Sequence, residues 1–172
     1  AYVISSLRVA YFKVNYPAAY YAAYFSVRAD EFYYQVMCRP LAQISAQREE
    51  MFKNFHQLNT REQKIYYILE LVEEMYLRGL DFAPLDIERA GASRFLVLDD
   101  KTLMPALNTL PSISTAMASA IVEAREKDGP FLNHEDLGRR AGLGPSAIAS
   151  MVELGLLDHI PESAQISLFD ML

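Results

Sequence analysis

The chain has 172 residues, of which 52% are hydrophobic and 22% are charged, and its formal net charge is −6. This length is enough for one domain with a solid core or for two small domains. The negative charge argues against a protein that wraps nucleic acid by bulk electrostatics, because such proteins carry an excess of lysine and arginine. Any contact with nucleic acid is therefore expected to be local.

The sequence carries no recognisable targeting, membrane or metal signal. Ala1 starts within an apolar helical pattern, and no apolar run reaches the length of about eighteen residues that a membrane helix needs. We therefore expect a piece of a longer protein that has no membrane partner. The single Cys38 fits a reducing cytoplasm, most simply as a small buried hydrophobe. His56, His134 and His159 lack partners at metal-ligand spacing, so we predict no metal site.

Helices are predicted through the first third of the chain. Residues 2–14 are apolar on most of the helix circumference, which predicts a helix packed on several sides. Pro17 opens a second helix, because a proline at the first helical position loses no intrahelical hydrogen bond. A third helix is expected over residues 41–55. Basic residues outnumber acidic ones in this part, and Arg8 and Lys13 are candidate DNA contacts.

The clearest helix in the sequence begins at a predicted capping box of Thr60 and Gln63. Apolar residues then recur at three- and four-residue spacing until Gly79, which supplies a left-handed stop. Beyond this helix the periodicity is lost, and residues 95–98 and 102–104 predict the two strands of a small hairpin. The aspartates at the turn between the strands are interpreted as turn formers, since aspartate bonds its own backbone there.

The second half repeats a layout of helix, tight turn and helix. The turn of the first unit is residues 111–114, and the turn of the second unit is residues 141–144. Such a turn and the start of the following helix point unpaired N–H groups outward, and the helix dipole adds positive charge, so a phosphate fits without lysine. The candidate DNA-binding residues are Ser112, Ile113, Ser114, Thr115, Gly142, Leu143 and Gly144. A plain helical cap without a ligand is the alternative interpretation.

The last residues of the chain form a short peptide beyond Pro161. Leu168 and Phe169 follow a polar run and have no neighbouring segment to fold around. They are better explained as anchors for a groove on another protein, with Gln165 as the hydrogen-bonding end. Packing of this peptide on its own domain is the alternative.

Several motifs together resemble one protein family. They are residues 8–13, 21–26, 78–82, 101–105, 124–126, 129–131 and 165–170. In this order they resemble the C-terminal part of PolC-type DNA polymerase III α subunits, the C-family replicative polymerases of Gram-positive bacteria. The resemblance covers essentially the whole chain. It implies DNA-directed DNA synthesis, with Mg²⁺, by a much larger protein that also carries a 3′ to 5′ exonuclease.

The resemblance also implies an organisation of the chain. Residues 1–105 would belong to the helical fingers region with its small β-hairpin, residues 106–158 would form a tandem helix-hairpin-helix module that grips duplex DNA, and residues 159–172 would form a flexible tail. The expected fold is therefore mainly α. The residues implied to bind the sliding clamp are Gln165, Leu168 and Phe169. The expected partners are primer-template duplex, the sliding clamp and other replisome subunits. The family's catalytic aspartates lie upstream, so no catalytic residue is assigned and the chain alone is expected to be inactive.

One departure from the family concerns the first turn. The family's turn resembles Pro-Gly-hydrophobe-Gly, whereas this chain has Ser112 and Ser114. Holding a serine in a left-handed conformation costs about 1–2 kcal/mol, and glycine avoids that cost. We therefore expect duplex binding to depend more on Gly142 and Gly144.

Two other classes of function stay open. A DNA-repair nuclease could carry the same tandem hairpins, and a nuclease site in place of a polymerase palm would distinguish it. A non-enzymatic helical adaptor could present the same clamp-binding tail, and it would have no affinity for primer-template.

Overall fold

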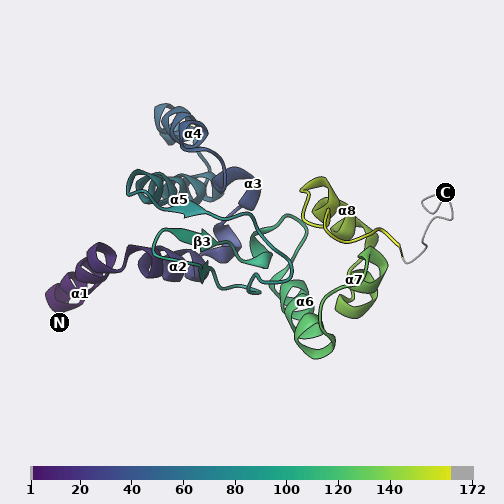
Figure 1. The fold of residues 1–172 in the computed structure, drawn as a ribbon. Helices are drawn as coiled ribbons and strands as arrows, with labels where there is room; N and C mark the ends of the chain where they lie inside the picture. The colour runs from purple at the N-terminus through teal and green to yellow at the C-terminus, as the bar shows by residue number, and fades with distance from the viewer. Residues whose placement is uncertain (1, 164–172) are drawn as a thin grey trace.

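The computed structural model describes residues 2–163 and is mainly helical (Figure 1). The helices of the first half are α1 (Tyr2–Asn15), α2 (Pro17–Val27), α3 (Tyr34–Met37), α4 (Leu41–Lys53) and α5 (Thr60–Leu77). The strands are β1 (Asp81–Phe82), β2 (Leu96–Val97) and β3 (Thr102–Met104). The second half contains α6 (Thr115–Asp128), α7 (His134–Ala141) and α8 (Pro145–Glu153), and short 3-10 turns lie at Ala29–Glu31, Phe55–Gln57 and Leu107–Thr109. The predicted fold class is confirmed.

The core of the first half is aromatic. Phe25 of α2 is fully buried, and its ring centroid lies 5.2 Å from that of Phe32, 5.7 Å from that of Phe82 and 5.6 Å from that of Phe95. Offset and edge-on ring pairs at such distances add to the free energy gained by burial. These rings attach the small sheet to α2. The helix opens at Pro17, as predicted.

The sheet has the strand order β1-β3-β2. β2 and β3 pair antiparallel with Val97 opposite Leu103, which confirms the predicted hairpin. Asp99 acts as a turn former, since its Oδ1 accepts the N–H of Lys101 at 2.8 Å. β1 pairs parallel with β3 and was not predicted, because a strand of two residues shows no alternation to detect.

The capping box of α5 lies one residue earlier than predicted. Asn59, not Thr60, is the N-cap: its side chain accepts the N–H of Glu62, and the Glu62 carboxylate accepts the N–H of Asn59. The sequence allows both registers, and the carboxylate is a stronger acceptor than the amide of Gln63 and also favours the positive end of the helix dipole. The prediction of Thr60 and Gln63 was therefore wrong in register.

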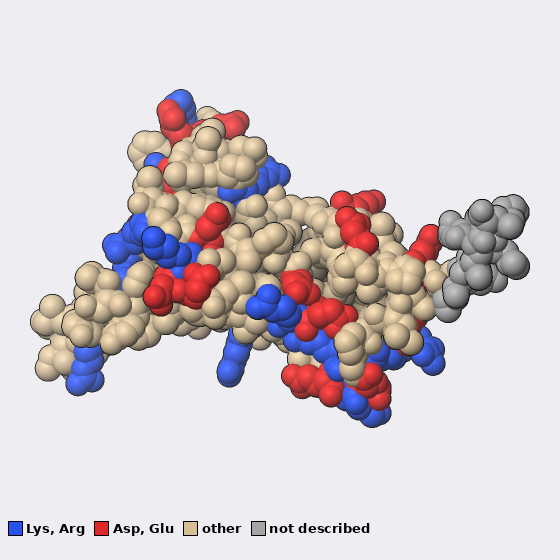
Figure 2. All heavy atoms as spheres, in the orientation of Figure 1, with Lys and Arg blue, Asp and Glu red and all other residues tan. Residues whose placement is uncertain are grey.

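The prediction that residues 2–14 are packed on several sides was also wrong. No residue of α1 is buried, and Tyr2 and Leu7 are 91% and 65% exposed. Among the described residues α1 lies against α2, and Lys13 reaches Glu74 of α5. Figure 2 shows that the surface of this end is largely uncharged. The pattern of apolar residues identifies an apolar helix, but it does not identify which segment packs against that helix.

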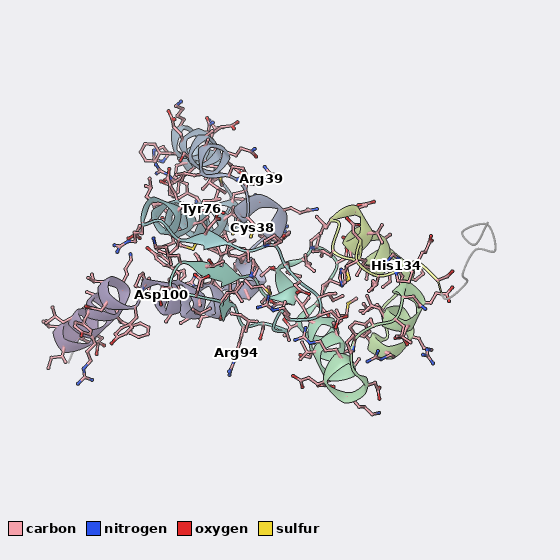
Figure 3. All side chains as sticks on the ribbon, viewed as in Figure 1. Cys38, Arg39, Tyr76, Arg94, Asp100 and His134 are labelled. Atoms are coloured by element: carbon pink, nitrogen blue, oxygen red, sulfur yellow. The ribbon has the colours of Figure 1, made fainter. Side chains whose placement is uncertain are left out.

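The second hydrophobic cluster joins α6, α7 and α8. Ile121, Leu137 and Met151, one from each helix, are at most 1% exposed. The segment after α8 returns across the start of α7, near His134 (Figure 3). There the N–H of His134 donates to the carbonyl of Pro161 at 3.0 Å. These helices therefore form one packed unit at the end opposite to α1 (Figure 1). Within residues 2–163, no helix is both long and apolar enough to cross a bilayer.

Candidate nucleic-acid interface

The first hairpin, residues 111–114, joins the 3-10 turn Leu107–Thr109 to α6. Ser112 has φ 66°, the left-handed conformation predicted for this position, and among the described residues it is the only one other than glycine with positive φ. Ile113 points into the core and is 5% exposed. Ser114 is the N-cap of α6 at φ −73° and ψ 163°, and its Oγ accepts the N–H of Met117 at 3.2 Å.

The second hairpin, residues 141–144, joins α7 to α8. Gly142 has φ 64° and ends α7, and its N–H donates to the carbonyl of Gly138. Leu143 points into the same core and is 8% exposed. Gly144 is the N-cap of α8 at φ −76° and ψ 163°, with no side chain to cap the helix, and Pro145 follows at the first helical position.

The two hairpins therefore repeat one backbone conformation. A left-handed residue comes first, a buried aliphatic residue second, and an extended N-cap third. The correspondence corrects one expectation from the sequence: only Ser112 bears the left-handed strain, because Ser114 is in extended backbone that any residue adopts. Ser114 stabilises α6 as an N-cap.

The hairpins differ in the donors that they offer to an anion. The first N–H groups of a helix have no intrahelical acceptor, and the helix dipole favours negative charge at that end. At α6 the Ser114 hydroxyl already accepts one of these donors. At α8 no side chain does so: Pro145 has no N–H and Ala147 donates to the Gly144 carbonyl at 3.1 Å, which leaves the N–H groups of Gly144 and Ser146 for a ligand. A Cβ built on Gly144 would meet nothing within 4 Å. The second hairpin thus combines uncapped donors with open space, which is the chemistry of a phosphate site.

Charged side chains around the hairpins are of both signs. Figure 2 shows acidic and basic groups intermixed over α6, α7 and α8. Arg139 is exposed, with 80% of its side chain accessible, and it donates to Asp136 at 2.8 Å. Arg125 is directed inward and donates to the carbonyls of Ile87 and Ala90. Side chains alone therefore provide little positive field, and backbone donors matter more.

Asp136 is the buried carboxylate of α7. Its Oδ2 lies 3.0 Å from Nη1 of Arg140, and Arg139 contacts the other oxygen. Burial on its own would raise the pKa of Asp136, but hydrogen bonds from Arg139 and Arg140 outweigh burial and hold the pKa below its ordinary value. The carboxylate therefore stays ionised and keeps both arginines in place.

The structure does not bring Arg8 and Lys13 to the hairpins. Both lie on α1, at the opposite end of the molecule (Figure 1). Lys13 makes an ion pair of 2.6 Å with Glu74 and stands 5.3 Å from the centre of the Tyr20 ring. Its charge is thus engaged within the protein.

The remaining predicted residues fall into two groups. Thr115 lies at the start of α6, where its Oγ1 accepts a hydrogen bond from the side chain of Asn108 at 3.1 Å. The predicted clamp-binding residues Gln165, Leu168 and Phe169 lie outside the described residues.

The resemblance implies Mg²⁺ for the full polymerase and no metal for this segment. In the stretch 2–163, no three His, Cys, Asp or Glu side chains come together in a way that could hold a metal ion. Cys38 lies with Tyr76 beside α3 and α5 (Figure 3), and burial raises the pKa of its thiol well above the ordinary value.

The geometry of two consecutive hairpins, each followed by a helix, defines a class of DNA-binding fold. The chain belongs to the helix-hairpin-helix motif family, whose model matches residues 79–166. Over 171 residues, 99% of its length, it is 39% identical to the DNA polymerase III PolC-type of Staphylococcus aureus strain MW2, and the same values hold for strains USA300 and NCTC 8325. The chain spans 12% of the length of these relatives. The resemblance indicated by the motifs is thereby confirmed.

Two features of this region were not predicted from the sequence. The first is the capping role of Ser114, for which the available signal is a serine directly before a helix. The inward direction of Arg140 was also missed. Its position in the last turn of α7 gives no sign that its side chain is only 12% exposed.

Proposed function

We propose that this chain is the part of a PolC-type replicative DNA polymerase that holds the primer-template duplex. The identity to PolC-type relatives along the whole chain supports this assignment. In this proposal residues 106–158 are the duplex-binding module and residues 1–105 belong to the fingers region. DNA synthesis and the 3′ to 5′ exonuclease reside in parts of the protein beyond this chain, in the cytoplasm.

The observation that carries duplex binding is the second hairpin. No side chain caps its helix at Gly144, and among the described residues no atom beyond the chain neighbours lies within 4 Å of a Cβ built on this glycine, which leaves room for a phosphate. Contacts from backbone N–H groups to phosphates carry no base information, so binding should be independent of sequence. This suits a polymerase, which must hold every sequence that it copies.

Duplex binding is tested by titrating a fluorescent duplex of mixed sequence with the purified chain at several salt concentrations. Each neutralised phosphate contributes about −0.9 to the slope of log K against log salt, so contacts to roughly two to four phosphates give a slope of roughly −2 to −4. A much steeper slope would place the main contacts on basic side chains such as Arg8. Absence of duplex binding would overturn the proposal and favour the alternative of a non-enzymatic helical adaptor that binds only the clamp.

We further propose that Gln165, Leu168 and Phe169 bind the sliding clamp. Burial of the two apolar side chains gives about 3–5 kcal/mol before the cost of ordering the peptide, so the isolated peptide should bind in roughly the micromolar range. Tethering beside DNA-bound hairpins raises its effective concentration. The test is titration of the clamp with a peptide of residues 162–172 and with the same peptide carrying Phe169→Ala. Binding that is indifferent to this change would refute the assignment.

A further inference from the structure

Arg140 connects the end of α7 to the end of α6. Its Nη2 donates to the carbonyls of Ala124 at 2.6 Å and Gly129 at 2.7 Å, and its Nη1 donates to the carbonyl of Pro130 at 3.1 Å. The guanidinium carbon stands 4.6 Å from the centre of the Phe131 ring. The side chain therefore joins α7 to α6 and to the connection between the two units.

The chemistry of this contact is directional. Ala124 lies near the end of α6 and Gly129 follows it, so the guanidinium stands at the negative end of the helix dipole, where a cation is favoured. The planar guanidinium supplies several donors in fixed directions, whereas a lysine ammonium concentrates its donors on one atom. Nη1 of Arg140 also donates to the Asp136 carboxylate at 3.0 Å. Charge alone would not reproduce this set of contacts.

We propose that Arg140 is a positioning residue that sets the orientation of the second hairpin relative to the first. α6 begins at the first hairpin, and Arg140 fixes its far end to the turn of α7 that leads directly into Gly142. Both hairpins can then engage one duplex at the same time. This inference rests on the duplex binding proposed above.

The neighbouring Arg139 provides a matched control. It contacts the same carboxylate of Asp136, but its side chain is 80% exposed and no carbonyl of α6 accepts from it in the described part of the chain. Arg139→Lys and Arg140→Lys make the same chemical change at adjacent positions. Only Arg140→Lys removes the guanidinium that bridges α7 and α6.

The first measurement needs no DNA. Spin labels on cysteines placed at the exposed positions Ala116 and Ser146, in a Cys38→Ser background, report the distance between the starts of α6 and α8 by pulsed electron resonance. We expect a narrow distance distribution in the parent and in Arg139→Lys, and a clearly broader or shifted one in Arg140→Lys. An unchanged distribution in Arg140→Lys would overturn the proposal. If that variant does not fold, Arg140→Gln, which keeps a planar donor group, replaces it.

The second measurement is duplex binding of the same full-length variants. When the hairpins cannot bind together, we expect Arg140→Lys to weaken affinity about tenfold, the equivalent of one charge-assisted hydrogen bond. We also expect it to reduce the steepness of the salt dependence by about 0.9 for each phosphate that the variant no longer neutralises. Weaker affinity with an unchanged slope would indicate only a smaller folded fraction and would overturn the proposal. Absence of duplex binding by the parent chain would instead refute the proposed function, and the distance measurement would still decide the role of Arg140.

Discussion

The first and second hairpins reach the same backbone conformation with different residues. Ser112 and Gly142 have φ values of 66° and 64°, and the N-caps that follow share ψ 163°. The conformation is therefore a requirement of the unit, because it buries Ile113 or Leu143 and starts the next helix. A serine is held there by the surrounding packing despite its strain.

What differs is the use of the helix N-terminus. In the first hairpin Ser114 occupies a backbone donor and stabilises α6 from within the protein. In the second hairpin the corresponding donor, the N–H of Ala147, bonds to the main-chain carbonyl of Gly144 at 3.1 Å, and no side chain caps α8. The first hairpin thus uses a side chain to stabilise its helix, whereas the second keeps a bare main chain that a phosphate can approach, although the φ and ψ values of the two N-caps are alike.

The largest effect is expected from Gly144→Val. Its φ of −76° suits valine, and apart from the chain neighbours no described atom lies within 4 Å of the new Cβ, so the fold should be retained. The added side chain would block close approach of a phosphate, with loss of one or two charge-assisted bonds of about 1.5–3 kcal/mol each. Duplex titration with a melting control measures this effect. A duplex affinity equal to that of the parent chain would show that the second hairpin does not contact the duplex.

A smaller effect, on stability, is expected at the left-handed positions. Gly142→Ala should lower the free energy of unfolding by about 1–2 kcal/mol, and Ser112→Gly should raise it by up to about 1 kcal/mol, because glycine tolerates positive φ but has greater entropy when unfolded. Urea denaturation of both variants measures these changes. Equal signs for the two substitutions would show that the strain at Ser112 is not significant.

Ser114→Gly should make the N-terminus of α6 in the first hairpin more like that of α8 in the second. Replacing an N-cap serine by glycine costs only a few tenths of a kcal/mol, and it removes the side-chain acceptor of the Met117 N–H. We therefore expect a small gain in duplex affinity with nearly unchanged stability. Unchanged affinity, measured beside Gly144→Val, would mean that this donor does not face the duplex.

The smallest effect concerns pH and the second unit alone. The pKa of Asp136 is lowered in the folded protein, so its contribution to stability is complete above the ordinary value of about 3.9 and is lost as the pH falls below it, through the folded pKa. The difference in melting temperature between the parent and Asp136→Asn should therefore shrink below about pH 4. A difference that stays constant down to pH 2.5 would show that ionisation of Asp136 does not stabilise α7.

Local patterns were sufficient for much of this fold. The periodicity of α5, the hairpin of β2 and β3 and the two turns of the second half all leave signals within a few neighbouring residues. Two overlapping capping boxes at Asn59 and Thr60 could not be separated by pattern, because both satisfy the same rule. The strength of the Glu62 carboxylate as an acceptor decided between them.

Long-range contacts were not predictable from the same patterns. The exposure of α1 and the inward direction of Arg140 depend on which segments meet in space, and sequence spacing does not report this. The candidate site was identified through its glycines and serines. The difference in donors between the two hairpins required the side-chain geometry of Ser114.

The central claim is that backbone N–H groups of the second hairpin contact phosphate. The most direct test is an NMR titration of the ¹⁵N-labelled chain with a short duplex, following each amide signal. We predict that the largest shifts occur at Gly144 and Ser146, that they decrease in Gly144→Val, and that the amides of α1 remain unaffected. Shifts concentrated around Arg8 and Lys13, with the second hairpin unchanged, would contradict the account.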